Sequence, residues 1–208
     1  MLKEGRKLVF VSATLTILVW FLTFKSFVFY VPTLFLCLLT LLLLNFFRDP
    51  QREIKKNNTV LYSPADGKIF EIQERDNTYC IKIFMSIFDV HIQRAPVDCI
   101  VERIIYEKGK FYPAGKDKTE KFNERNTIIL KDKYGAELKI IQLAGIAARR
   151  IICWVREKDN IVQGSKIGAI MLGSQVNFEF PKNIYKLLVS KGQKVYAGIS
   201  IVAVKRGE

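Results

Sequence analysis

The sequence predicts a mainly β soluble domain, a flattened sandwich or barrel-like body with one short helix, preceded by an α-helical membrane hairpin. Residues 8–47 are almost continuously apolar, which sets them apart from the rest of the chain. From residue 60 onward the apolar runs are short and are separated by turn residues, as is typical of β-strands. Helical periodicity is scarce in this part. We therefore expect an anchor over residues 1–47 and a β domain over residues 48–208.

Two apolar runs form the predicted hairpin, "LVFVSATLTILVWFLTF" and "FVFYVPTLFLCLLTLLLLNFF". The first is near the lower length limit for a membrane span and the second is long enough to cross alone, so one crossing helix beside a re-entrant one is the alternative. A cleavable signal peptide fits poorly, because the apolar region is too long and no small-residue cleavage site follows it. Lys25, at the expected outer turn, can snorkel to the far interface. Basic residues flank both ends of the hairpin, which places both ends on the cytoplasmic side: Lys3, Arg6, Lys7, Arg48, Arg52, Lys55 and Lys56.

The rest of the chain is strongly basic. The chain has 33 Lys and Arg against 20 Asp and Glu, and only 4 and 1 of these lie in the first 47 residues, which leaves a net charge of +10 from residue 48. On a membrane-tethered domain this charge is best explained by anionic lipid headgroups. Nucleic acid is not expected as a partner, because no aromatic-plus-basic motif or recognition helix accompanies the charge. We therefore expect a protein of the cell (inner) membrane with its soluble domain on the cytoplasmic side.

The four cysteines are scattered, and the chain has a single histidine, so no metal site is expected. They are interpreted as small apolar residues in a reducing compartment. Along the domain, the segment "AGIAARRIICWV" (144–155) is expected to supply the short helix. The expected strands and turns, in chain order, lie in "SPADGKI", "YCIKIFMSIF", "DVHIQRAPVDCIVERIIYEKG", "RNTIILKDKYGAELKIIQLAG", "GAIMLGSQVNFEFP" and "IYKLLVSKGQKVYAGISIVAVKRG".

Lys191 and Lys194 lie near the tip of a predicted hairpin in the last segment. Biotinyl and lipoyl modules carry a modifiable lysine at such a tip. The methionine that usually flanks that lysine is absent here, so a structural hairpin is the better interpretation.

The pair Gly173-Ser174 interrupts a strand-like run in which Val176, Phe178 and Phe180 alternate with polar residues. A glycine inside a strand usually marks a bulge or a close backbone approach. The functional alternative is self-cleavage. A serine hydroxyl can attack the preceding carbonyl, and β-elimination from the resulting ester breaks the chain and leaves, after hydrolysis, an N-terminal pyruvoyl group. Such a ketone condenses with amine substrates and acts as an electron sink in decarboxylation, the role otherwise filled by pyridoxal phosphate.

Seven segments in order resemble the phosphatidylserine decarboxylase proenzymes of the short bacterial and archaeal type. They are "FFRDPQREI", "SPADGKI", "FMSIFDVHIQRAPVDCIV", "ERN", "QLAGIAARRI", "GSKIGAIMLGSQVNFEFP" and "VSKGQKVYAGISI". The resemblance covers nearly the full length.

The resemblance implies autocatalytic cleavage between Gly173 and Ser174, which yields a β chain of residues 1–173 and an α chain of residues 174–208. Ser174 would become the covalent pyruvoyl group, with no added cofactor or metal. The substrate would be phosphatidylserine and the products phosphatidylethanolamine and carbon dioxide. The two chains would form a heterodimer, and assembly into a higher oligomer is left open.

The resemblance also implies a Ser-His-Asp-like catalytic group made of Ser174, His91 and Asp66. His91 is the natural proton carrier at neutral pH, although a lone histidine is more often a core or surface residue. Asp66 is followed by a glycine, and Asp-Gly is also a standard turn pair. Larger members of the family have a second histidine where Arg94 stands here, so either His91 serves both maturation and decarboxylation, or water or a backbone group covers one stage.

Two other functions compete with this interpretation. A non-enzymatic, membrane-tethered β domain that binds anionic lipids predicts an uncut chain. A serine hydrolase also predicts an uncut chain, but would be expected to carry a G-x-S-x-G motif, which is missing around Ser174. Asp89 and Asp98, which flank the histidine, are weaker site candidates, and apolar residues near Phe111 and Tyr112 are candidates for membrane docking.

Overall fold

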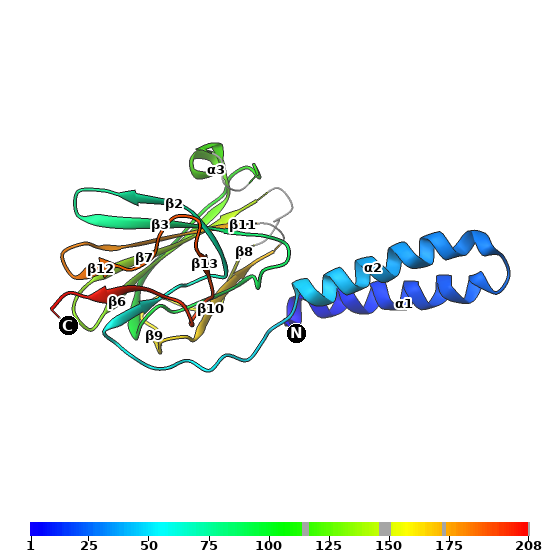
Figure 1. Ribbon diagram of the computed structural model, residues 1–208, viewed down its shortest axis with the longest axis horizontal. Helices are drawn as coiled ribbons and strands as arrows, with labels where there is room; N and C mark the ends of the chain where they lie inside the picture. The colour runs from blue at the N-terminus through cyan, green and yellow to red at the C-terminus, as the bar shows by residue number, and fades with distance from the viewer. Residues whose placement is uncertain (114–116, 146–150, 172–173, 208) are drawn as a thin grey trace. The chain divides into compact units, whose positions relative to one another are not determined.

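The computed structural model describes residues 1–113, 117–145, 151–171 and 174–207 (Figure 1). The chain divides into two compact units, residues Met1–Gln51 and Arg52–Glu208. The first is helical and the second is built mainly of β-strands, which confirms the predicted fold class.

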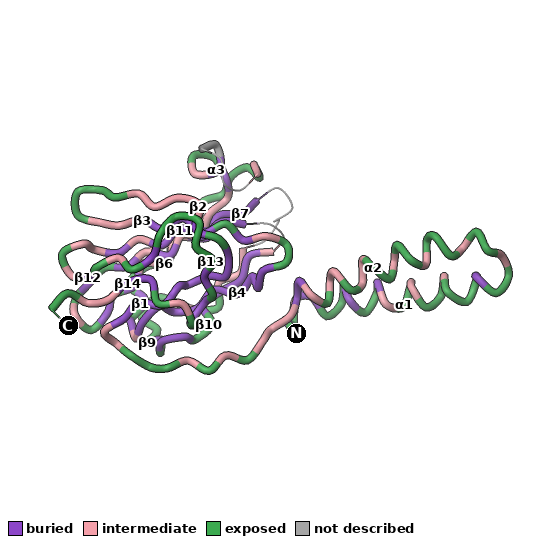
Figure 2. The backbone as a smooth tube through the Cα atoms, in the orientation of Figure 1, coloured by how far each residue is buried: buried purple, intermediate pink, exposed green. Residues whose placement is uncertain are grey.

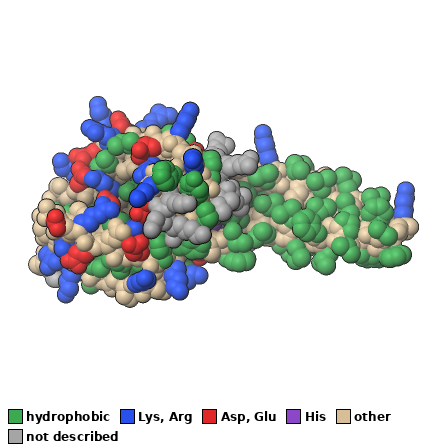
Figure 3. All heavy atoms as spheres, turned by 90° about the horizontal axis from the view of Figure 1, so that it is seen from above, with side chains coloured by type: hydrophobic (Ala, Val, Ile, Leu, Met, Phe, Trp, Pro, Cys, Tyr) green, Lys and Arg blue, Asp and Glu red, His purple; other side chains and the backbone are tan. Residues whose placement is uncertain are grey.

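The first unit is a helical hairpin. Its elements are η1 (Lys3–Gly5), α1 (Arg6–Thr23), η2 (Phe27–Phe29) and α2 (Tyr30–Phe46). The Thr40 hydroxyl lies 2.7 Å from the Ser12 hydroxyl, which joins α2 to α1, and the Leu2 amide donates to the Phe47 carbonyl at 2.9 Å. Both helical segments are long and apolar enough to cross a membrane, and hydrophobic side chains cover the surface of this unit (Figure 3). These features indicate membrane association.

The second unit contains three antiparallel sheets within the described residues. The largest has the strand order β13-β2-β3-β11-β7-β6-β5-β9, and the other two have the orders β1-β14-β12 and β4-β10-β8. The strands are β1 (Val60–Tyr62), β2 (Gly67–Glu74), β3 (Thr78–Met85), β4 (Ile92–Arg94), β5 (Cys99–Glu107), β6 (Arg125–Asp132), β7 (Glu137–Ala144), β8 (Ile151–Cys153), β9 (Asn160–Ile161), β10 (Lys166–Ile170), β11 (Ser174–Pro181), β12 (Tyr185–Leu187), β13 (Lys194–Val195) and β14 (Ile201–Lys205). One short helix, α3 (Asp117–Phe122), lies between β5 and β6.

The core follows from the alternation of side chains along the central strands. Val176, Phe178 and Phe180 of β11 are fully buried and join one apolar cluster with the alternate residues of β3 and β7. Figure 2 shows the buried backbone concentrated in the sheets of this unit. β11 pairs with β3 on one side and β7 on the other without a register shift. The first residue of β11, Ser174, is therefore placed by two neighbouring strands.

Two sequence expectations were wrong in detail. The segment 144–155 does not supply the short helix in its described part, because Ile151–Cys153 forms β8 and pairs with β10; residues 146–150 lie outside the described residues. The run around Gly173-Ser174 is not one strand with a bulge in its middle. β10 ends at Ile170 in one sheet and β11 begins at Ser174 in another, so the chain changes sheets between them. Gly173 itself lies outside the described residues.

Candidate active site

Ser174 is fully buried at the first position of β11. Its neighbours across the sheet are Met85, the last residue of β3, and Ala144, the last residue of β7. The Ser174 hydroxyl lies 3.5 Å from the Met85 sulfur, a weak hydrogen-bond acceptor. The hydroxyl is therefore held in a dry position on a fixed strand end, directly after the predicted cleavage site, and among the described residues it contacts no strong acceptor.

His91 is buried between β3 and β4, and its ring has a defined tautomer. The Nδ1 atom lies 2.9 Å from the Asp89 carbonyl oxygen, which can only accept a hydrogen bond. Nδ1 of the neutral ring must therefore carry the proton, which leaves the lone pair on Nε2. This is the tautomer of a general base that acts through Nε2.

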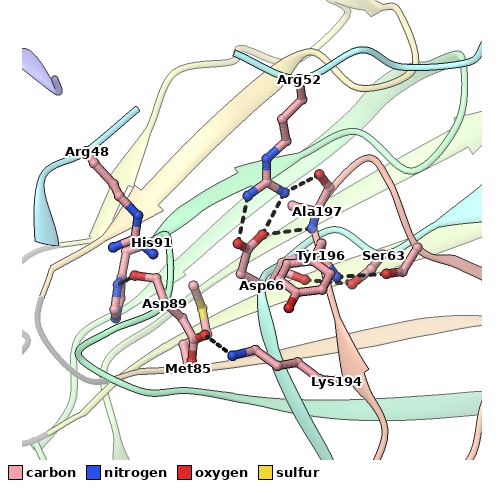
Figure 4. Close-up of polar contacts among 12 residues, drawn as sticks. Arg48, Arg52, Ser63, Asp66, Met85, Asp89, His91, Lys194, Tyr196 and Ala197 are labelled. Atoms are coloured by element: carbon pink, nitrogen blue, oxygen red, sulfur yellow. Dashed lines mark hydrogen bonds and ion pairs between the residues drawn. The ribbon is translucent and has the colours of Figure 1, made fainter. Parts of the chain in front are cut away.

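Asp66 lies at the end of the turn before β2 and is also buried. Its two carboxylate oxygens accept from the two terminal nitrogens of Arg52 at 2.7 Å each, and Oδ1 also accepts from the Ala197 amide at 2.8 Å (Figure 4). Arg52 in turn donates to the Ala197 carbonyl at 2.5 Å. This bidentate pair, with both side chains less than a tenth exposed, fastens the start of the second unit to the loop before β14.

The glycine after Asp66 is required by the backbone. Gly67 has a φ of +150°, and a Cβ at this position would lie 2.2 Å from the Phe84 carbonyl oxygen. β2 can therefore approach β3 closely here only with glycine. The close approach fixes the position of Asp66 relative to β3.

The three predicted catalytic residues do not form a hydrogen-bonded triad. Among the described residues, Asp66 contacts Arg52 and Ala197, the Ser174 hydroxyl contacts Met85, and the His91 Nδ1 contacts Asp89. Ser174 and His91 are instead linked through Gln93, whose amide nitrogen lies 3.7 Å from the Met85 sulfur and 3.1 Å from the His91 carbonyl oxygen.

Gln93 belongs to a buried chain of amides that the sequence did not reveal. The Gln142 amide nitrogen donates to the Gln93 side-chain oxygen, and the Asn126 amide nitrogen donates to the Gln142 oxygen, each at 2.8 Å. A Cβ on Gly168 would lie 2.8 Å from the Gln142 nitrogen, so glycine leaves room for this chain. The three residues stand far apart in the sequence, and only the pairing of β6, β7 and β4 with their neighbours brings them together.

The weaker candidates have structural partners. Asp89 accepts from the Ser86 amide at 2.9 Å and the Ser86 hydroxyl at 2.7 Å. Asp98 accepts from the Gln163 amide at 2.7 Å and the Asn58 side chain at 2.9 Å. Burial by itself raises the pKa of Asp98, but these two hydrogen bonds outweigh it and the pKa is lowered. Arg94 is buried and donates to the Gly164 carbonyl at 2.9 Å.

Two of the cysteines have buried thiols that are kept protonated by their surroundings. Burial raises the pKa of both Cys80 and Cys99 to about 12, so their thiols stay protonated at neutral pH. Within the described part of the chain, no group of three or more His, Cys, Asp and Glu side chains is arranged to hold a metal ion.

The chain is similar in sequence to known decarboxylase proenzymes. The family model for phosphatidylserine decarboxylase matches residues 39–203. A phosphatidylserine decarboxylase proenzyme of Carboxydothermus hydrogenoformans is 40% identical over 177 residues, which cover 82% of this chain and 83% of the relative. One of Syntrophus aciditrophicus is 37% identical over 208 residues, covering 95% and 94% of the two chains. A Methanosarcina barkeri relative, 41% identical over 79% of this chain and 78% of its own, is named as an archaetidylserine decarboxylase proenzyme.

The chain has a β unit with a serine buried at a strand end, and this unit is joined to two apolar helices. Together with these relatives, this architecture defines the class of the protein as a phospholipid decarboxylase made as a proenzyme. The chain belongs to the phosphatidylserine decarboxylase family. The resemblance noted from the sequence is thereby confirmed. Membership implies processing of the proenzyme into chains and a phospholipid substrate.

Proposed function

We propose that this chain cleaves itself between Gly173 and Ser174 and then decarboxylates phosphatidylserine to phosphatidylethanolamine. The observation that carries the proposal is the placement of Ser174: a buried hydroxyl on the first residue of a strand, directly after the predicted scissile bond, with a thioether sulfur as its hydrogen-bond partner. A hydroxyl bound to a strong acceptor would first have to give up that bond. The contact with Met85 costs little to break.

In the first stage, the Ser174 hydroxyl oxygen attacks the Gly173 carbonyl carbon, and the peptide bond is exchanged for an ester. Loss of the Ser174 Cα proton and departure of the Gly173 carboxylate then break the ester. The dehydroalanine left behind takes up water and releases ammonia, which leaves a pyruvoyl group on the chain of residues 174–208. His91, with its lone pair on Nε2, is the base that this stage requires, and its tautomer supports that role.

In the second stage, the pyruvoyl group supplies the electron sink that accepts the electron pair left when carbon dioxide departs. His91 delivers the proton to the substrate carbon that loses carbon dioxide. Burial of Ser174 and His91 supports this stage, because a dry site keeps a reactive carbanion from uncontrolled protonation by water.

Asp66 supports the reaction as a positioning residue. Its ion pair with Arg52 and its bond to the Ala197 amide fix the turn before β2, which lies against β3 and therefore against Met85. We place the enzyme at the cell (inner) membrane, with the second unit on the cytoplasmic side, as a heterodimer of residues 1–173 and 174–208. The domain boundary at residues 47 and 48 is part of this proposal.

The test is Ser174→Ala in the full-length chain, with the exposed Ser165→Ala as the control. The parent and the control should each give two bands on a denaturing gel, and Ser174→Ala should give one band and no decarboxylase activity. Cleavage that persists in Ser174→Ala would overturn the mechanism. An uncut but active parent would overturn the proposed chemistry.

A further inference from the structure

We propose that the turn between β3 and β4, residues 86–90, docks the second unit on an anionic bilayer and delivers His91 to the headgroup level. The inference rests on the proposed function, because a phospholipid substrate has to be reached at the surface of a bilayer. The docking surface is defined by four apolar and two basic side chains: Phe84, Ile87, Phe88, Tyr196, Lys68 and Lys194.

The apolar part of this surface consists of four large side chains that are each more than a third exposed. Phe88 is 64% exposed and Ile87 41%, and these two residues form the tip of the turn. Phe84 on the outer face of β3 is 38% exposed, and Tyr196 after β13 is 44% exposed. Large apolar side chains gathered in this way mark a site of association with a protein or a membrane.

Lysines border the apolar tip. Lys68 of β2 pairs in register with Phe84 and with Lys194 of β13, so all three lie at adjacent positions on the same sheet. The Lys194 ammonium lies 3.5 Å from the Asp89 carboxylate and 5.8 Å from the centre of the Tyr196 ring (Figure 4). Lysine stems can pack along apolar surface while their charges reach lipid phosphates.

The turn is closed by hydrogen bonds and is coupled to the histidine. Asp89 accepts from the Ser86 amide and hydroxyl through its side chain, and its own amide donates to the Ser86 carbonyl at 3.0 Å. The carbonyl of the same Asp89 accepts from the His91 Nδ1. The residue that closes the turn therefore also orients the imidazole, so a lipid contact at Phe88 is made three residues from the proton carrier.

A bilayer fits this surface better than a protein partner. The chain is basic from residue 48 onward, with a net charge of +10, and each lysine near an anionic membrane adds favourable energy. An apolar tip with a cationic border matches the order of layers in a membrane, where acyl chains lie below the phosphates. The candidate region suggested by the sequence fits less well, because its apolar residue Phe111 is 37% exposed, against 64% for Phe88 at the tip of the turn, and the Tyr112 amide donates to the Asn123 side chain at 2.8 Å.

The direct test is fluorescence quenching in the full-length chain. Phe88→Trp is made in a background with Trp20→Phe and Trp154→Phe, and the protein is reconstituted in vesicles of phosphatidylglycerol and acyl-brominated phosphatidylcholine. The matched control is Ile100→Trp in the same background, because Ile100 is 48% exposed at the opposite end of the sheet. Bromine should quench the tryptophan of Phe88→Trp and leave that of Ile100→Trp unquenched.

A second measurement connects docking to catalysis. Phe88→Glu and Ile100→Glu are assayed on phosphatidylserine in vesicles and on a short-chain, monomeric phosphatidylserine. The ratio of vesicle to monomer kcat/KM should fall about tenfold in Phe88→Glu, equivalent to about 1.4 kcal/mol, and should stay constant in Ile100→Glu. The ratio cancels any change in folding or chemistry, since both substrates use the same site.

The outcomes separate the two proposals. Equal quenching of the two tryptophan variants, or an unchanged activity ratio in Phe88→Glu, overturns the docking turn while leaving the decarboxylase proposal intact. If the parent chain is uncut or inactive on both substrates, the proposed function fails and quenching alone decides the docking. Emission from Phe88→Trp that is shielded from bromine and shifts with protein concentration would mean that a second copy covers the turn, which also overturns the proposal.

Discussion

At the residue scale, the histidine is the group on which both proposed stages depend. His91 is the only imidazole in the chain, and the Asp89 carbonyl fixes its tautomer with the lone pair on Nε2. An imidazole can both accept and donate a proton, which is what the two proposed stages require.

His91→Ala should therefore reduce decarboxylase kcat by about 100-fold or more, the usual contribution of a positioned general acid or base. The measurement is a steady-state assay of protein that has been checked for cleavage on a denaturing gel. A cleaved but inactive variant would assign His91 to decarboxylation alone, and an uncut variant would assign it to maturation. Activity at the level of the parent would remove His91 from the mechanism.

The ion pair between Arg52 and Asp66 is the second residue-scale feature. Arg52 was expected as a basic residue that flanks the membrane segment, yet it is buried against Asp66 in a bidentate pair. Arg52→Met should lower the free energy of unfolding by about 3–5 kcal/mol, because it leaves a buried carboxylate without its partner. The double variant Arg52→Met with Asp66→Asn should recover part of that loss, since no buried charge remains.

Thermal unfolding in detergent measures the effect, with Arg75→Met as the control, because the Arg75 side chain is 54% exposed in its pair with Glu179. An Arg52→Met protein as stable as the Arg75→Met protein would contradict the assignment of a structural role to the pair.

At the element scale, the buried amides explain how β4, β6 and β7 hold the site. Gln142→Leu would remove the acceptor of the Asn126 amide nitrogen and the donor to the Gln93 side-chain oxygen, and unpaired buried polar groups cost about 1–3 kcal/mol each. We expect a lower melting temperature and slower self-cleavage, measured by differential scanning fluorimetry and by a time course on a gel. Gln142→Glu keeps the acceptor for Asn126 and should be milder in its effect on stability; equal stability of Gln142→Leu and the parent would contradict the account.

A second element-scale feature joins α3 to the sheet. Lys82 of β3 is almost fully buried and pairs with Glu120 of α3 at 2.6 Å and with Glu71 of β2 at 2.9 Å. Burial by itself lowers the pKa of Lys82, but the hydrogen bonds that its ammonium donates to Glu120 and Glu71 outweigh this effect, so the pKa is raised above 10.5. The hydrogen bond from Lys82 lowers the pKa of Glu71 below 4.5.

The directions of these two pKa shifts determine how the stability of the fold depends on pH. The stabilisation from Glu71 is present above its ordinary pKa of 4.5 and is lost as the pH falls through the lower folded value. The stabilisation from Lys82 is present below 10.5 and is lost as the pH rises through the higher folded value. Glu71→Gln should therefore make thermal stability less sensitive to acid below pH 4.5, as measured by melting curves across the acid range. An unchanged acid dependence would show that the pair contributes nothing.

The sequence predicts those elements whose signal lies within a few neighbouring residues. The apolar runs, the alternation in β11 and the turn at Asp66-Gly67 each lie within a few residues, so periodicity and turn chemistry predict them. The end of β10 and the start of β11 could not be predicted in the same way, because a change of sheet leaves no mark on hydrophobicity. In the described part of the helix expected at 144–155, residues 151–153 form β8 instead, because β10 offers them a partner strand that the local sequence does not reveal.

The residues of the candidate site also fall into those with a signal in the sequence and those that only the fold brings together. Ser174 and His91 were nominated by their chemistry and by family resemblance. Their supporting residues Gln93 and Gln142, and Arg52, which holds Asp66, are common polar residues far apart in the chain, and only the folded sheets give them a role.

At the scale of the whole molecule, cleavage would not release the smaller chain. Residues 174–208 contain β11 between β3 and β7, β13 beside β2, and β14 beside β1. Each of these pairings joins the two proposed chains through backbone hydrogen bonds and the shared core. We predict that both chains elute together in native size-exclusion chromatography in detergent and separate only in denaturant. Loss of the small chain under native conditions would contradict the interleaved arrangement of the strands.

The central claim is that Ser174 becomes a ketone at the start of a new chain, and intact-mass spectrometry of the purified protein tests it most directly. The account predicts a fragment of residues 174–208 that is lighter than the serine-headed peptide by the mass of one ammonia and that gains hydrogen on treatment with borohydride. A fragment with an unaltered serine at its amino end, or a single chain of full-length mass, would contradict it.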